Sequence, residues 1–125
     1  MATRSLTKQD EAAIFQLAKQ WGKIVVRRAF GDQGPGLDVD LDTMEAVAVA
    51  AAQGLTAGAL EEATQQQAQH LGAQQACPAC GRLCDVKHEE RPVIVRGGQF
   101  VHREPLCHCP TCRRDFFPST SAAEN

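Results

Sequence analysis

The chain of 125 residues carries 13 basic and 15 acidic side chains, which gives a net charge of −2. This length accommodates one domain, or one small domain with an appendage. The charge balance excludes a protein that binds nucleic acid through overall charge alone. Because no stretch approaches the roughly 20 consecutive apolar residues of a membrane span, we expect no contact with a membrane.

The first predicted element is a helix over residues 8–30. Thr7 and Asp10 have the spacing of a capping box, and the glycines and the proline of 31–36 end the helix. No apolar signal-peptide core precedes it, so we expect a cytoplasmic protein. Its apolar residues recur at helical spacing: Ile14, Leu17, Ala18, Trp21, Ile24 and Val25.

A second helix is predicted over residues 43–71, which completes a helical region of residues 1–72. Asp42 followed by Glu45 marks its start, whereas Gly54 and Gly58 weaken it, so one long helix and two shorter ones both remain open. Its apolar stripe indicates helix-on-helix packing, with a homodimer as the alternative. The stripe comprises Met44, Val47, Ala48, Ala51, Leu55, Ala59, Ala63 and Leu71.

The next region, residues 73–118, contains two Cys-x-x-Cys pairs and is the predicted ribbon. Cys77 and Cys80 form the first pair, and Cys109 and Cys112 the second. Two pairs of thiolates are the ligand set of a closed tetrahedral Zn²⁺ site. Gly81 can adopt the positive φ with which the chain leaves the first pair. Arg113 stands at the equivalent position of the second pair, where a positive φ would cost about 1–2 kcal/mol.

A β-hairpin connects the two pairs. Residues 91–106 read as two β-rich runs around Gly97-Gly98, a favoured two-residue turn. This turn pairs Val95 with Phe100 and Ile94 with Val101. One face of the hairpin then covers the cysteine pairs, and the other requires a helix or a partner chain. The sequence therefore predicts a zinc ribbon.

The cysteines have other interpretations. Disulfides require an oxidising compartment, and a dithiol redox centre belongs at a helix start within a βαβ unit, which neither pair has. An iron site of the rubredoxin type uses the same four thiolates and remains open. Cys84 and Cys107 are left over, either as small buried apolar residues or, for Cys107, as a thiol near the metal. We expect His88 and two further histidines, His102 and His108, to be surface or strand residues, because four cysteines suffice.

The predicted ribbon is mildly basic, with 7 basic and 5 acidic side chains between residues 77 and 118. Arg113 and Arg114 follow the second cysteine pair, and Arg96 and Arg103 lie on the hairpin, so these four are the candidate nucleic-acid contacts. The interspersed acidic residues are equally typical of an ordinary solvated surface. Of the adjacent Phe116 and Phe117, we expect at least one to pack on the cysteine pairs or on the helices, with base stacking as the alternative.

The order of these motifs resembles a known family. CPACG at Cys77, a hairpin with RPVIV at Arg91, HCPTC ending at Cys112 and RRDFFP ending at Pro118 are similar to the N-terminal zinc-binding region of insertion-sequence transposases of the Kra family. The match covers residues 42–118. It implies a module that binds DNA or assists transposase assembly, with a transposase catalytic subunit as a partner.

The sequence departs from that family in two places. Arg113 replaces the usual glycine, and residues 119–125, which we expect to form a flexible tail, leave no room for the RNase H-like catalytic domain. We therefore expect no strand-transfer activity, whether the chain is a fragment, half of a split element or a domesticated descendant. The full expectation is an α+β, noncatalytic zinc-ribbon module that binds DNA or assists transposase assembly. The alternative is a protein-interaction or dimerisation module in which zinc is purely structural.

Overall fold

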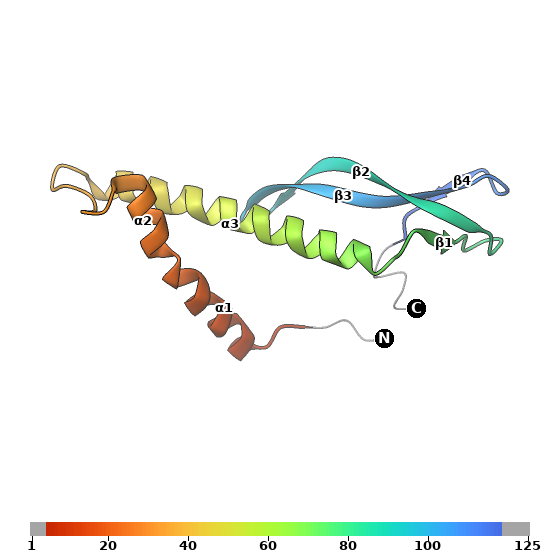
Figure 1. The fold of residues 1–125 in the computed structure, drawn as a ribbon, viewed down its shortest axis with the longest axis horizontal. Helices are drawn as coiled ribbons and strands as arrows, with labels where there is room; N and C mark the ends of the chain where they lie inside the picture. The colour runs from red at the N-terminus through yellow and green to blue at the C-terminus, as the bar shows by residue number, and fades with distance from the viewer. Residues whose placement is uncertain (1–4, 119–125) are drawn as a thin grey trace. The chain divides into compact units, whose positions relative to one another are not determined.

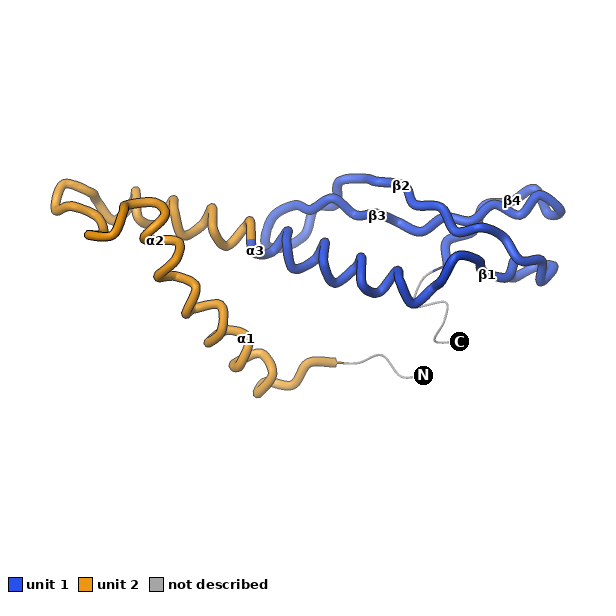
Figure 2. Tube along the Cα trace, in the orientation of Figure 1, with its two compact units in different colours: residues 1–2, 55–125 blue, residues 3–54 orange. Residues whose placement is uncertain are grey.

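The computed structural model describes residues 5–118, so the tail expected at 119–125 lies outside the described residues. Three helices precede four strands, which confirms the α+β class (Figure 1). The chain forms two compact units, one ending at Gly54 and one beginning at Leu55 (Figure 2). The elements are α1 (Lys8–Gln20), α2 (Gly22–Phe30), α3 (Leu41–Gln69), β1 (Gln74–Ala76), β2 (Leu83–Val95), β3 (Gly98–Cys109) and β4 (Arg114–Phe116).

The predicted first helix is present but interrupted. Its capping box is confirmed, because the Asp10 amide donates to Thr7 Oγ1 at 3.0 Å and the Thr7 amide donates to Asp10 Oδ2 at 3.1 Å. At Trp21 the backbone stays in the right-handed helical region (φ −72°, ψ −12°), but the Ile24 amide closes a tight three-residue turn onto the Trp21 carbonyl at 3.0 Å. Gly22, a weak helix former, follows directly and explains why the helix divides into α1 and α2 here.

The long helix α3 begins two residues earlier than predicted. The cap is Asp40 rather than Asp42: the Thr43 amide donates to Asp40 Oδ1 at 2.8 Å. This hydrogen bonding also lowers the pKa of the Asp40 carboxyl. Gly54 and Gly58 do not interrupt α3, which resolves the open alternative in favour of one helix. Gly72, with φ +74°, reverses the chain after the helix and leads it into β1.

The C-terminal part of α3 packs on the hairpin. Its half-buried face differs from the predicted stripe, because Ala59 and Ala63 are exposed. The hairpin determines which face is covered, and the Val101 amide donates to Glu61 Oε2 at 3.1 Å across the contact. The covered residues recur every three or four positions: Leu60, Thr64, Ala68 and Leu71.

The four strands form one antiparallel sheet in the order β1-β2-β3-β4. The long hairpin β2–β3 was predicted, but its turn lies at Arg96-Gly97 and not at Gly97-Gly98. The predicted pairing of Val95 with Phe100 and of Ile94 with Val101 is therefore wrong. The observed partners are Val95 with Gly98, Ile94 with Gln99, Val93 with Phe100 and Pro92 with Val101.

The position of the turn has a tertiary cause. A Cβ atom on Gly97 would lie 2.6 Å from Thr56 Oγ1 of α3, so only glycine fits where the turn meets the helix. Phe100 is buried on the α3 side of the hairpin, whereas Ile94 on the opposite face is 85% exposed. Farther along that opposite face, Cys107 faces the cysteine cluster. As predicted, one face of the hairpin meets the cysteines and a helix covers the other.

Candidate metal centre

The first cysteine pair lies in the loop between β1 and β2. The Cys77 amide donates to the Arg82 carbonyl, and the Gly81 amide donates to the Cys77 carbonyl, both at 2.8 Å. These two hydrogen bonds close a tight turn around Cys80. Gly81 leaves the turn with φ +79°, which confirms the role predicted for this glycine.

The second pair lies between β3 and β4 and repeats the first with one difference. The Cys112 amide points at the Cys109 sulfur, with a nitrogen-to-sulfur distance of 3.5 Å. Arg113 then adopts φ +55°, the one described non-glycine residue with positive φ. The positive φ considered for this position from the sequence is thus present, and the Cβ atom of Arg113 makes this conformation sterically strained.

The two turns bring four sulfur atoms together. Those of Cys77, Cys80, Cys109 and Cys112 all lie within 4.8 Å of one another. The shortest separations are 3.5 Å, between Cys80 and Cys109, and 3.8 Å, between Cys77 and Cys112. A tetrahedral Zn²⁺ ion with bonds of about 2.3 Å requires sulfur atoms roughly 3.8 Å apart. The sulfurs are too far apart for disulfides, whose length is about 2.05 Å, and the set fits a metal ion such as zinc.

The electrostatics of the cluster favour thiolates at selected positions. Backbone amides, that of Cys112 first, lower the pKa of Cys109 to about 6. The amides of Cys80 and Ala79 likewise lower the pKa of Cys77. Hydrogen bonding of Cys112 with the sulfurs of Cys80 and Cys77 raises the pKa of Cys112 to about 12. The metal-free cluster therefore shares protons among its sulfurs, and a bound cation would displace them.

The two remaining cysteines lie beneath the cluster. Cys84 is 4% exposed and Cys107 is 1% exposed, and both pack against Cys77 and Cys109. Burial raises the pKa of each thiol. Neither thiol belongs to the group of four sulfurs, so both cysteines act as small buried apolar residues of the core. Phe116 packs against the same core, as expected for one of the two phenylalanines.

Two side-chain contacts that the sequence did not predict support the turns: one joins the first turn to the second, and the other lies beside the second turn. Arg82 Nη1 donates to Thr111 Oγ1 at 2.9 Å and thereby joins the first turn to the second. His108 Nδ1 and Asp115 Oδ1 lie 2.7 Å apart across β3 and β4. The only sequence signal for the first contact is the position of Arg82 directly after Gly81, which does not identify a partner 29 residues away.

The predicted arginine contacts do not form one patch. Arg113 and Arg114 lie beside the second cysteine pair, whereas Arg96 lies in the turn that joins β2 to β3. Figure 1 shows β4 and this turn at opposite ends of β3. Twelve residues of β3 separate the two places, a span of roughly 40 Å at about 3.3 Å per residue. Arg103 lies between them on β3 and faces Glu90 at 3.8 Å.

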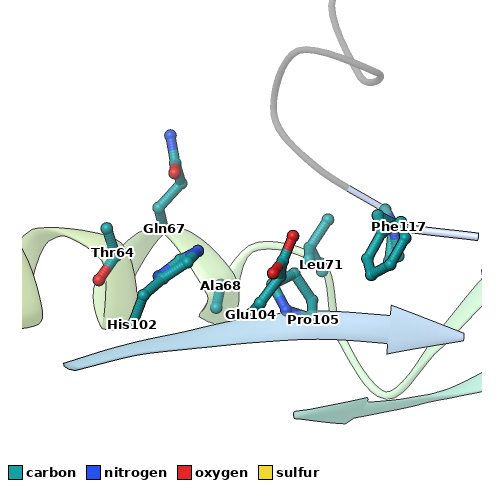
Figure 3. Close-up of a pocket in the computed structure, with 9 residues that line it drawn as sticks. Thr64, Gln67, Ala68, Leu71, His102, Glu104, Pro105 and Phe117 are labelled. Atoms are coloured by element: carbon teal, nitrogen blue, oxygen red, sulfur yellow. The ribbon is translucent and has the colours of Figure 1, made fainter. Parts of the chain in front are cut away.

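A small cavity lies between α3 and β3 (Figure 3). Its volume is about 100 Å³, enough for a few water molecules and below the roughly 300 Å³ at which ligand pockets begin. His102 lines it, and its buried Nδ1 has no hydrogen-bond partner among residues 5–118. Glu104, beside it, is held by Arg91 at 2.6 Å. His102 and the two other histidines considered as ligands, His88 and His108, do not belong to the group of four sulfurs.

No family model matches the chain, and no curated protein or solved structure matches it. The metal centre therefore rests on its own geometry, and the likeness to transposases remains a hypothesis from the sequence. None of the described helices is long and apolar enough to cross a membrane.

Proposed function

We propose that this chain is a noncatalytic zinc-ribbon module that binds DNA at the end of the ribbon that carries the cysteine pairs. Four thiolates fill a tetrahedral coordination sphere, which leaves no position for a water that the metal could activate. The metal would then act as a folding element, and a reducing cytoplasm would keep its ligands in the thiol form. The resemblance to the N-terminal region of Kra-family transposases supports the same role, with element ends or a catalytic subunit as partners.

One observation carries this proposal. Several acidic side chains of the ribbon have partners among the described residues, whereas the two arginines that follow the second cysteine pair have no acidic partner there. Arg103 and Arg91 engage Glu90 and Glu104, and Asp115 lies 2.7 Å from His108, which is charged only when it is protonated. Arg113 and Arg114 have no acidic partner within ion-pair distance in the described part of the chain. A zinc ion with four thiolates carries a charge of about −2, which offsets part of this positive charge. We therefore expect binding that is weak and falls steeply with salt.

A fluorescence anisotropy titration of the zinc-loaded protein with labelled duplex and single-stranded DNA tests the proposal. Replacing Arg113 and Arg114 with alanine together should weaken binding and reduce the slope of log K against log salt by up to about two contacts. Arg96→Ala removes one equal charge from the far end of the hairpin and should reduce affinity less. No binding at low salt, or equal losses from both ends, would contradict a contact at the cysteine end.

The alternative is a protein-interaction module in which zinc is purely structural. The exposed apolar side chains of α1 and α2, among them Trp21 at 51% and Ile24 at 67% exposure, favour it. The two functions give different results in the same experiment. A protein that binds no DNA at low salt, yet associates with itself or another protein when residues 113 and 114 are alanine, belongs to the second class.

A further inference from the structure

Within the compact unit that ends at Gly54, the described residues leave the apolar face of α1 and α2 uncovered. Neither helix contains a buried residue. An isolated helix shorter than about 12–15 residues is only marginally stable in water; α1, with 13 residues, lies within this limit and α2, with 9, lies below it. Four large side chains on this face are half-exposed or more. They are Ile14 at 53%, Leu17 at 57%, Trp21 at 51% and Ile24 at 67%.

These four residues follow one another at intervals of three, four and three positions, the spacing of a helix-to-helix seam. Asp10 lies four positions before the first of them, and Arg28 lies four positions after the last, so the seam continues to a charged residue at each end. Arg28 has no ion-pair partner among the described residues. Asp10 uses Oδ2 for the helix cap, which leaves Oδ1 available.

We propose that a second copy of this chain covers this face in antiparallel orientation. The seam has an isoleucine toward each end, Leu17 and Trp21 at its centre, and opposite charges at its two ends. Antiparallel pairing places Ile14 against Ile24 of the second copy, and Leu17 against Trp21 of the second copy. The same register places Asp10 against Arg28 of the second copy, twice per dimer by symmetry. Parallel pairing would instead bring each charge against its own kind.

A dimer of this kind is reversible. Residues 8–30 form a helical segment roughly 35 Å long, and two such segments make an interface at the lower end of the about 1,200–2,000 Å² of stable complexes. The helix divides at Trp21, but the backbone there stays in the right-handed region, so α2 follows α1 directly and the spacing of the seam residues is kept. The proposal concerns α1 and α2 alone and does not depend on the DNA contact.

Sedimentation velocity of the zinc-loaded full chain over a range of concentrations tests the apolar part of the seam. We expect a concentration-dependent dimer whose dissociation constant rises more than about tenfold for Leu17→Ala. Phe15→Ala is the matched control, because Phe15 is equally exposed, at 62%, but lies off the seam, and this variant should dimerise normally. A monomer at all concentrations, or equal effects of the two variants, would overturn the proposal.

The charged ends test the orientation. Arg28→Glu should weaken the dimer about fivefold to tenfold, whereas Lys19→Glu, the same charge change on the outer face, should not. Asp10→Asn keeps an oxygen that can accept the cap hydrogen bond, so helicity by circular dichroism should be retained. On its own this change should weaken the dimer, but added to Arg28→Glu it should strengthen it. If it weakens the dimer in both backgrounds, residues 10 and 28 do not meet and the antiparallel register is wrong.

Discussion

Replacing Arg113 with glycine should stabilise the protein. Arg113 holds φ +55° directly after the second cysteine pair, where its Cβ is crowded, whereas Gly81 holds φ +79° at the equivalent position of the first pair. Relief of a left-handed conformation is worth about 1–2 kcal/mol. Glycine also loses more entropy on folding, by roughly 0.5–1 kcal/mol. The expected net gain in the free energy of unfolding is therefore between about 0 and 1.5 kcal/mol.

Denaturant unfolding at a fixed free zinc concentration measures this gain, because zinc that binds only the folded chain would otherwise change the apparent stability. Arg114→Gly is the matched control. It removes the same side chain one position later, within β4, where Arg114 pairs with Cys109 in the sheet. Glycine there should destabilise the strand. If Arg113→Gly destabilises the protein as much as Arg114→Gly does, the strain argument at this turn is wrong.

Three further results are expected. Cys84→Ser should retain zinc but lower stability, because it places a hydroxyl in the buried core; loss of stoichiometric zinc would instead make Cys84 a ligand. Gly97→Ala should destabilise the ribbon by about 1–3 kcal/mol through its contact with Thr56, as thermal unfolding would show, and an unchanged melting temperature would contradict that close approach. Zinc binding should release protons at pH 7, since the metal-free pKa of Cys112 is about 12. The affinity for zinc should rise with pH and fall steeply below the metal-free pKa of Cys109, about 6. Calorimetric titration with zinc in buffers of different ionisation enthalpy would detect the released protons. Equal binding heats in all buffers would contradict their release.

The local features of the metal centre could be predicted from the sequence because short-range chemistry determines them. Two residues between cysteines direct both sulfurs of a pair to one side of a tight turn, and a residue with positive φ, Gly81 in the first pair and Arg113 in the second, ends each turn. The hairpin followed from its β-rich runs and turn residues. The capping box of Thr7 and Asp10 is equally local, since both hydrogen bonds span three residues.

The features that could not be predicted depend on contacts between distant parts of the chain. The hairpin register depends on the approach of Gly97 to Thr56, 41 residues earlier in the sequence, which no pattern within the hairpin reveals. Strands β1 and β4 have three residues each, too few for a periodic signal, and exist because they pair with β2 and β3. The dispersal of Arg96 and Arg113 to opposite ends follows from the length of the same hairpin.

The measurement that tests the central claim most directly is the metal content of the purified protein. Native mass spectrometry with elemental analysis should give one zinc ion per chain, and Cys77→Ser should lose the metal and the ribbon while most helical circular dichroism remains. One equivalent of iron in place of zinc would preserve the site but change its metal. A metal-free protein with a folded ribbon, or Cys77→Ser that keeps its metal and fold, would contradict the four-cysteine centre.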